Sequence, residues 1–226
     1  MVASLCAAFK ITSNSRYIKI TITMKIKTVI FDLGGVLIDW EPRRLFRKIF
    51  DNEEEMEYFL NNVCTPDWNV QQDGGRTLKE ATETKVAEFP NYESQIRAFY
   101  GRWEEMLGGA IQGTVDILQK VRDAEHLRLY ALTNWSAETF PVALRDYEFL
   151  QWFEGILVSG DEKMIKPQPE IYNLILERYD IEASSSVFID DSLKNIKGCE
   201  TCGIHGIHFT SPEQLAKDLE AMGVVL

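Results

Sequence analysis

Five short runs that are apolar on both faces constrain the fold of this chain more than any other feature. They occupy residues 28–31, 127–132, 155–158, 186–189 and 204–209. Such runs are typical of parallel strands covered by helices on both sides. Segments with helical spacing follow most of them, as expected where right-handed crossovers join parallel strands. The sequence therefore predicts an α/β protein with a Rossmann-like open parallel sheet.

Helices are expected at residues 114–124, 169–179, 192–201 and 212–222. In the first of them Val115, Leu118 and Val121 recur at helical spacing. The second opens with Pro169, whose missing N–H costs nothing in the first turn of a helix. These segments supply the crossovers that the parallel sheet requires.

The connection between Asp39 and Gly108 is too long for a simple crossover. Helical stretches are predicted at 42–50, 52–62 and 92–107, and Thr77 and Glu80 have the spacing of a capping box. We therefore expect residues 41–107 to form a helical cap. The cap is inserted into a core made of residues 24–40 and 108–226, with Gly108 and Gly109 as a hinge at its exit.

Residues 1–23 are expected to be an N-terminal extension, and they leave three interpretations open. Met24 is an alternative start, which would make the preceding residues dispensable. The acid-poor segment resembles a transit peptide weakly, and residues 17–23 alternate with period two like an edge strand.

Composition limits the class of protein. A hydrophobic content of 45% and a charged content of 26% over 226 residues fit a soluble globular protein. The net charge of −11 argues against nucleic acid as a partner, and no apolar run is long enough to cross a membrane. The four cysteines form no small-scaffold disulfide framework, which favours a reducing, cytoplasmic location. A monomer and a homodimer both remain open.

Chemically active side chains follow the predicted strands. They are Asp32 after the first strand, Thr133 and Asn134 after the second, Lys166 after the third, and Asp190 and Asp191 after the fourth. Ligands of open α/β sheets bind at the carboxyl ends of the strands. A carboxylate nucleophile, a lysine and oxygen ligands for Mg²⁺ at this edge suit phosphoryl transfer through an aspartyl-phosphate.

With these four motifs in order over residues 26–210, the chain resembles the haloacid dehalogenase-like (HAD) hydrolase superfamily, in its branch with a helical cap. The stretches FDLGGVLID and FIDDSLKNI are most similar to sugar-phosphate phosphatases, glucose-1-phosphate phosphatases among them, and to the N-terminal phosphatase domains of epoxide hydrolases. The resemblance implies a Mg²⁺-dependent phosphatase of small phosphorylated metabolites, with sugar phosphates as the expected substrates.

The resemblance also implies roles for individual residues. Asp32 is the expected nucleophile, and Thr133 and Lys166 are the expected contacts of the transferring phosphoryl group. The expected Mg²⁺ ligands are the side chains of Asp32 and Asp191 and the backbone carbonyl of Gly34. Three further residues would support the site. Asp190 and Asn195 would support the metal from nearby without binding it directly, and Asn134 would line the site.

Gly34 departs from the family pattern, since most phosphatases of the family carry a second aspartate there. That aspartate protonates the leaving oxygen, and general acid–base help of this kind is worth about 10²–10⁴-fold in rate. Three explanations remain: a slow enzyme, a leaving group that needs little protonation such as an anomeric sugar hydroxyl, or an acid from elsewhere. Asp39, Glu41 or a side chain of the cap could supply that acid.

The cap would close over the site and select the substrate. Trp68, Gln71 and Arg76 are the expected contacts of the leaving group, because an aromatic face and amide side chains suit a sugar ring. A wider set of candidates for the same contacts contains Trp40, Asn69, Gln72 and the turn at 73–76.

Two other functions remain open. A metal-independent 2-haloacid dehalogenase would use the same aspartate to displace halide. A phosphate-binding protein would keep the site without turnover.

Overall fold

A five-stranded parallel sheet forms the centre of the protein in the computed structural model, which describes residues 25–225. The strand order is β5-β4-β1-β6-β7. The strands are β1 (Thr28–Phe31), β4 (Arg128–Thr133), β5 (Gly155–Val158), β6 (Ser186–Asp190) and β7 (His205–His208). All four pairings between neighbours are parallel, which confirms the predicted α/β class.

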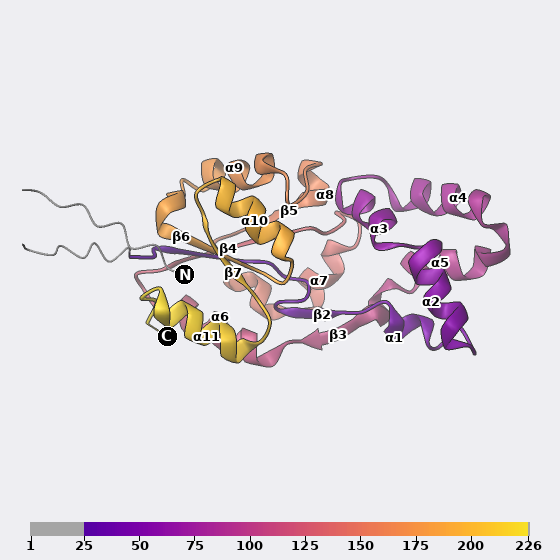
Figure 1. Cartoon of the computed structure of the whole chain (residues 1–226), viewed down its shortest axis with the longest axis horizontal. Coiled ribbons are helices and arrows are strands. Elements are labelled where there is room, and N and C mark those ends of the chain that lie inside the picture. Colours follow the sequence, from indigo (N-terminus) through magenta and orange to yellow (C-terminus); the bar gives the residue numbers. More distant parts are fainter. Residues whose placement is uncertain (1–24, 226) are drawn as a thin grey trace, which may run out of the picture.

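Successive residues of a strand point to opposite faces of the sheet, so each face has its own apolar layer. Ile30 and Phe188 pack on the side of α9 (Pro169–Arg178) and α10 (Leu193–Thr201). Val29 and Val187 pack on the side of α6 (Gln112–Asp123) and α11 (Pro212–Ala221). Figure 1 shows these two pairs of helices on the two sides of the sheet.

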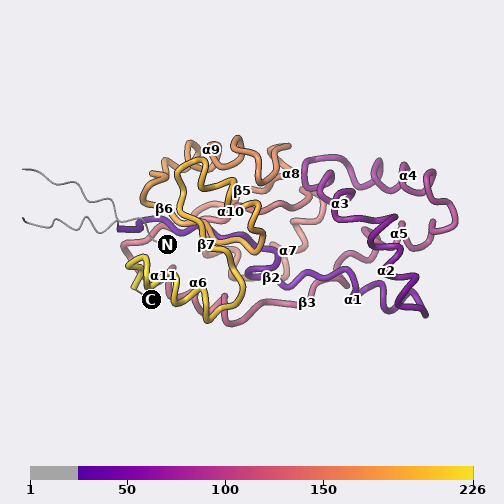
Figure 2. The backbone as a smooth tube through the Cα atoms, viewed as in Figure 1, coloured from indigo at the N-terminus to yellow at the C-terminus, as the bar shows by residue number. Residues whose placement is uncertain are grey.

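A second group of elements lies beyond one end of the sheet (Figures 1 and 2). They are β2 (Ile38–Trp40), α1 (Arg43–Phe46), α2 (Glu53–Asn62), α3 (Pro66–Asp73), α4 (Leu78–Glu88), α5 (Glu93–Gly101) and β3 (Leu107–Ala110). Strands β2 and β3 form an antiparallel pair that leads the chain out to the helices and back. The 3-10 turns η1 (Pro90–Tyr92) and η2 (Trp103–Met106) flank α5.

Two further helices and two 3-10 turns lie near the sheet. They are α7 (Phe140–Asp146), η3 (Glu148–Trp152), α8 (Ser159–Glu162) and η4 (Ala183–Ser185). The hydroxyl of Ser159 at the start of α8 donates to the backbone carbonyl of Asp73 at the end of α3, at 2.6 Å. This contact joins the outer helices to the carboxyl end of the sheet.

Several element boundaries differ from the sequence-based expectations. The helix expected at 42–50 is regular only over α1. The helix expected at 92–107 ends at Gly101, and Gly108 and Gly109 lie within β3, because β2 pairs with this segment. Helix α3 was not predicted, although Thr65 caps it by accepting from the Trp68 N–H and Pro66 opens it. The predictions for residues 1–23 lie outside the described part of the chain.

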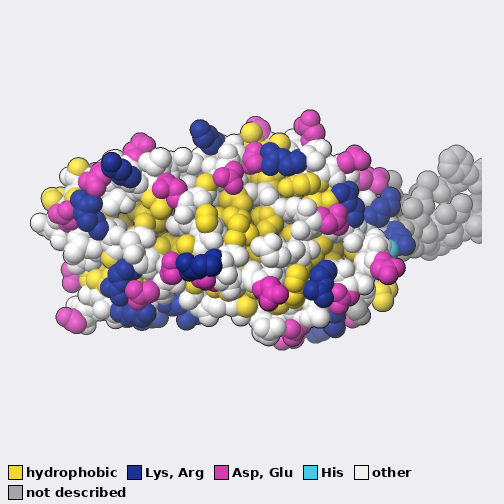
Figure 3. All heavy atoms as spheres, turned by 180° about the vertical axis from the view of Figure 1, so that it is seen from behind, with side chains coloured by type: hydrophobic (Ala, Val, Ile, Leu, Met, Phe, Trp, Pro, Cys, Tyr) yellow, Lys and Arg dark blue, Asp and Glu magenta, His cyan; other side chains and the backbone are white. Residues whose placement is uncertain are grey.

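The surface carries charges of both signs. On the face shown in Figure 3, Lys and Arg side chains stand among Asp and Glu side chains. Within residues 25–225, each helix is too short or too polar to cross a bilayer.

Candidate active site

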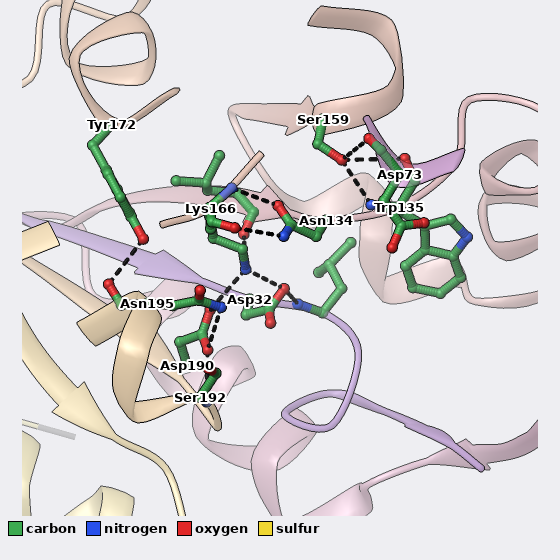
Figure 4. Close-up of polar contacts among 12 residues, drawn as sticks. Asp32, Asp73, Asn134, Trp135, Ser159, Lys166, Tyr172, Asp190, Ser192 and Asn195 are labelled. Carbon is green, nitrogen blue, oxygen red and sulfur yellow. Dashed lines mark hydrogen bonds and ion pairs between the residues drawn. The ribbon is translucent and has the colours of Figure 1, made fainter. Parts of the chain in front are cut away.

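The carboxyl ends of three neighbouring strands bring the predicted motifs together. Because β1 pairs with both β4 and β6, Phe31 lies beside Ala131 and Ile189 in the sheet. Asp32 follows β1, Thr133 ends β4 and Asp190 ends β6, so the three meet at one edge. Figure 4 shows the side chain of Lys166 extending to the carboxylates of Asp32 and Asp190.

Lys166 is the electrostatic centre of the group. Its Nζ lies 2.9 Å from Oδ1 of Asp32 and 2.7 Å from Oδ2 of Asp190, and it donates to the Leu132 carbonyl at 3.0 Å. The residue is 1% exposed. Burial favours the neutral amine, but the two carboxylates outweigh it and raise the pKa of Lys166. The lysine therefore carries a positive charge at neutral pH.

Asn134 holds this lysine in place through its backbone. The Asn134 Oδ1 accepts from the Lys166 N–H at 2.8 Å, and its Nδ2 donates to the Lys166 carbonyl at 3.0 Å. Asn134 also lines the cavity that opens above Asp32. A residue predicted to line the site thus also positions the lysine.

Asp32 presents one free oxygen. Its Oδ1 accepts from Lys166 and from the N–H of Leu33 at 2.7 Å, whereas no described residue donates a hydrogen bond to Oδ2. Burial raises the pKa of Asp32 to about 7, and Lys166 opposes that rise. The unpaired oxygen of a carboxylate oriented in this way is available as a nucleophile or a metal ligand.

Three carboxylates are close enough to share a cation. Oxygen atoms of Asp32, Asp190 and Asp191 lie within 4.8 Å of one another. Both carboxylate oxygens of Asp190 already accept hydrogen bonds, from Lys166, from the Ser192 N–H and from Asn195 Nδ2. Asp32 and Asp191 line the cavity, and burial followed by the Asp190 charge raises the pKa of Asp191. An all-oxygen donor set of this kind fits Mg²⁺, whose charge would offset the repulsion.

Gly35 shapes this acidic cluster. Its φ is +75°, a conformation that residues with a side chain rarely adopt, and a Cβ there would lie 2.4 Å from Asp191 Oδ2. Gly34 differs, because no atom other than those of Gly34 and its two chain neighbours lies within 4 Å of the position of its Cβ. The first glycine of the pair thus leaves an open space in the site, and the second makes room for a carboxylate.

Thr133 contributes a hydroxyl without a partner. The residue is 1% exposed, and Oγ1 makes no hydrogen bond in the described structure. Most buried polar groups are hydrogen-bonded, so this hydroxyl at the carboxyl end of β4 still has the capacity to bond to a ligand. Neither Thr133 nor Lys166 lines the cavity wall directly.

A cavity of about 250 Å³ opens above Asp32. Its aromatic walls are Trp40, Tyr100, Trp103 and Trp135. Its polar walls include Asn69, Asp73, Asn134, Ser136 and Thr139. The carboxylate cluster therefore lies at one end of a pocket that offers aromatic faces and amide and hydroxyl groups to the rest of a small ligand.

The predicted cap residues Trp68, Gln71 and Arg76 line a different cavity, of about 240 Å³. Trp68 is 4% exposed and packs on Phe99, with 5.1 Å between the ring centroids. The Arg76 Nε donates to Gln72 Oε1 at 2.8 Å. The structure does not bring these three side chains to Asp32.

The opposite face of α3 reaches the Asp32 cavity through Asn69 and Asp73, which stand four residues apart and share a helix face. Both belong to the wider set of candidates from the sequence, as does Trp40 in the same wall. The sequence did not single out Asp73 as an acid of the site. The capping signal Thr65-Pro66 could have located the helix and so revealed the shared face.

The two acids suggested near the first strand are engaged elsewhere. Asp39 pairs with Arg44, and Glu41 accepts from the Arg43 guanidinium at 3.2 Å. Neither carboxylate lines the cavity of Asp32.

The sheet is open and parallel, and acidic side chains surround a buried lysine at the carboxyl ends of its strands. This arrangement is typical of α/β enzymes, whose active sites lie at that edge of the sheet. The model of the haloacid dehalogenase-like hydrolase family matches residues 26–203. The chain belongs to this family, as its motifs indicated, and is a hydrolase of that kind.

Individual relatives agree with this assignment. A sesquiterpene phosphatase of Aspergillus oryzae is 27% identical over 201 residues, which are 88% of this chain and 96% of the relative. A phosphorylated carbohydrates phosphatase of Thermotoga maritima is 26% identical over 81% of this chain and 84% of its own. A HAD family enzyme of Bacteroides thetaiotaomicron, solved with magnesium and inorganic phosphate, is 26% identical, with a TM-score of 0.61 over 82% of this chain and 95% of that one.

Proposed function

We propose that this protein is a Mg²⁺-dependent phosphomonoesterase of small metabolites that works through a phosphoryl group on Asp32. The observation that carries the proposal is the placement of Asp32. One of its oxygens is held by Lys166 and Leu33, and the other is free beside two further carboxylates. The relatives named as phosphatases, and the neighbour solved with magnesium and inorganic phosphate, support the same reaction.

Each residue at the strand ends would have its own part in the reaction. The free oxygen of Asp32 attacks phosphorus, and the ammonium of Lys166 and the hydroxyl of Thr133 stabilise the phosphoryl oxygens. Asp32, Asp191 and the backbone carbonyl of Gly34 would hold the Mg²⁺, with Asp190 and Asn195 behind them. The ion would supply positive charge that draws the phosphate to the carboxylates and stabilises charge in the transition state.

Sugar phosphates are the proposed substrates. Aromatic faces and the amides of Asn69 and Asn134 surround the space beyond Asp32, and such groups suit a polyhydroxylated ring. This set replaces Trp68, Gln71 and Arg76 as the proposed contacts of the leaving group. The aromatic walls would also accept an apolar group, so an isoprenyl phosphate belongs among the substrates tested.

The proposal also covers the domain organisation, the location and the oligomeric state of the protein. Residues 41–107 would act as the cap over a core of residues 24–40 and 108–226. We propose a cytoplasmic monomer or homodimer that binds no nucleic acid, in line with the net charge of −11.

The test is an activity assay of the full chain with Mg²⁺ and with EDTA. The substrates are p-nitrophenyl phosphate, anomeric and primary-alcohol sugar phosphates, an isoprenyl phosphate and a 2-haloacid. We expect phosphate release that requires Mg²⁺, with anomeric sugar phosphates preferred. Halide release that persists in EDTA would establish the dehalogenase instead, and a folded protein that binds phosphate but is inactive on every substrate would establish the binding role.

Asp32→Asn tests the covalent step. It should lower turnover by more than about 10⁴-fold while the melting temperature stays near that of the wild type. The matched control is Asp123→Asn, since Asp123 is an exposed residue at the end of α6. An active Asp32→Asn protein would contradict the mechanism.

A further inference from the structure

The proposed reaction needs a proton that none of the groups assigned so far supplies. When the bond between phosphorus and the ester oxygen breaks, the leaving oxygen must be protonated unless it is already a stable anion. In the second step, the attacking water must lose a proton. The need for this proton carrier rests on the proposed phosphatase function.

The lining of the Asp32 cavity limits the possible donors. Asp32 is the nucleophile and Asp191 is a proposed metal ligand, so neither is available. The indoles, amides and aliphatic hydroxyls are too weakly acidic to exchange protons near neutral pH. Burial raises the pKa of the Tyr100 hydroxyl, which makes the phenol a still weaker acid. Among the described residues that line the cavity, Asp73 is the carboxyl group that remains.

Asp73 lies against the start of α8 and the loop that follows β4. Its backbone carbonyl accepts from Ser159 Oγ at 2.6 Å, and the backbone N–H of Ser136 is close enough to its carboxyl group to oppose the rise of its pKa. Figure 4 shows Asp73 beside Trp135 and Ser159, at the carboxyl end of the sheet. A residue of α3 is thereby fixed against the loop that follows β4.

A chain of hydrogen bonds fixes the same carboxyl group from the helix side. The Tyr100 hydroxyl donates to Asn69 Oδ1 at 2.9 Å, which turns the Asn69 Nδ2 toward Asp73 Oδ2 at 3.4 Å. Gln72 Nε2 donates to the Tyr100 oxygen at 2.8 Å and so orients that hydroxyl. This arrangement leaves the carboxyl group in place while a proton comes and goes.

The surroundings of Asp73 keep a substantial fraction of its carboxyl group protonated at neutral pH. Burial raises the pKa of Asp73 to about 7, against the opposing effects of the Ser136 N–H and of Lys166. Asp73 forms no ion pair with any described residue, and it ends α3, where the helix dipole also disfavours a negative charge. A carboxyl group of this kind can both give and take a proton under working conditions.

From the shared cavity, the fixed position and the elimination of the other lining groups, we infer that Asp73 is the general acid and base of the reaction. In the first step, Asp32 forms a bond to phosphorus, the bond to the ester oxygen breaks, and that oxygen takes the proton of Asp73. In the second step, Asp73 takes a proton from water as the water oxygen attacks phosphorus. The bond to Asp32 then breaks, which releases inorganic phosphate and restores both carboxyl groups.

The test compares Asp73→Asn with the wild type on phosphate esters whose leaving groups differ in basicity. The parameter is kcat/KM, because it covers the steps up to the departure of the leaving group. We expect kcat/KM to fall by about 10²–10⁴-fold for alkyl phosphates and by less than about tenfold for 2,4-dinitrophenyl phosphate, whose leaving group needs no proton. A burst of dinitrophenol should then precede slow turnover, since the water has lost its base.

Asp67→Asn is the matched control, because it makes the same substitution at an exposed position in the first turn of α3. It should leave all rates near the wild-type values. Equal rates of Asp73→Asn and wild type on alkyl phosphates would overturn the inference. So would an equal loss on all esters, which would indicate a structural role.

Gly34→Asp in the Asp73→Asn background is the second variant. The open space at Gly34 accepts a side chain in the same cavity, so a carboxyl group there can replace the lost proton donor. Recovery of at least tenfold in kcat/KM for alkyl phosphates, with no gain for the dinitrophenyl ester, would support the inference. A wild-type protein inactive on every phosphate ester would instead remove the proposed function itself.

Discussion

The ammonium nitrogen of Lys166 lies 2.9 Å from Oδ1 of Asp32, and the lysine side chain has no exposed area. This contact joins a residue that follows the first strand to one that lies over a hundred positions later. It neutralises part of the charge that three close carboxylates create, and it holds Oδ1 of Asp32, whereas Oδ2 accepts no hydrogen bond from a described residue. We therefore expect both the stability and the proposed chemistry to depend on this ion pair.

Replacing Lys166 by Met should destabilise the protein by about 3–5 kcal/mol, because Asp32 and Asp190 would be buried without a counter-charge. Phosphatase activity should be lost in parallel. Urea unfolding in EDTA measures the first effect, and Lys120→Met on the exposed face of α6 is the control. A Lys166→Met protein within ~0.5 kcal/mol of the wild type would show that the carboxylates do not need this lysine.

Thr133→Val should separate activity from stability. The Oγ1 of Thr133 is buried without a partner among the described residues, so its removal should leave stability unchanged or raise it by up to about 1 kcal/mol. If the hydroxyl binds a phosphoryl oxygen, kcat/KM should fall by roughly 10–100-fold, the value of a hydrogen bond to a charged group. Thr114→Val removes another buried, unpaired hydroxyl in α6 and should affect stability alone. Equal activities of the two variants would count against a role of Thr133 in binding.

Gly35→Ala should weaken Mg²⁺ binding. The new Cβ would lie 2.4 Å from Asp191 Oδ2, so the Asp191 carboxylate must shift from its present position in the cluster. We expect the dissociation constant for Mg²⁺, measured by calorimetry, to rise by at least about tenfold. Gly223→Ala is the control, because Gly223 has a φ of +82° but open space around its Cβ. Unchanged Mg²⁺ binding in Gly35→Ala would argue against Asp191 as a ligand.

Asp73→Asn should stabilise the protein at alkaline pH. The pKa of Asp73 is raised from 3.8 to about 7 on folding, so the folded state holds a proton that the unfolded state loses between these values. Wild-type stability should therefore fall as the pH rises through that window, whereas the asparagine variant lacks this loss. The charged groups that share the cavity or act on Asp73 are Asp32, Asp191 and Lys166, and the same three remain in the variant.

The expected gain from Asp73→Asn is roughly 1–3 kcal/mol at pH 8, vanishing toward pH 4. Urea midpoints at the two pH values measure it, with Asp67→Asn as the reference that shows no such gain. A variant that is more stable yet less active would fit a carboxyl group kept for its chemistry at a cost in stability. Equal stability of variant and wild type at pH 8 would mean that burial does not disfavour the charge of Asp73.

The sheet and the central site were predictable from local patterns. Short runs apolar on both faces located β1, β4, β5, β6 and β7, with boundaries within two residues of those observed. The position of Asp32, Thr133 and Asp190 at strand ends then implied their convergence, because parallel strands end at one edge of a sheet. Topology alone brings such residues together, so the prediction needed no knowledge of side-chain packing.

The cavity wall contributed by α3 could not be predicted in the same way. Which face of that helix meets Asp32 depends on the rotation of the helix, and packing of Trp68 against Phe99 and Tyr100 settles that rotation. Trp68, Gln71 and Arg76 consequently face a separate cavity, while Asp73 reaches the site. The sequence of a short polar helix does not say which of its faces will be turned toward the sheet. Contacts between residues distant in the sequence decide it, and only the folded structure contains them.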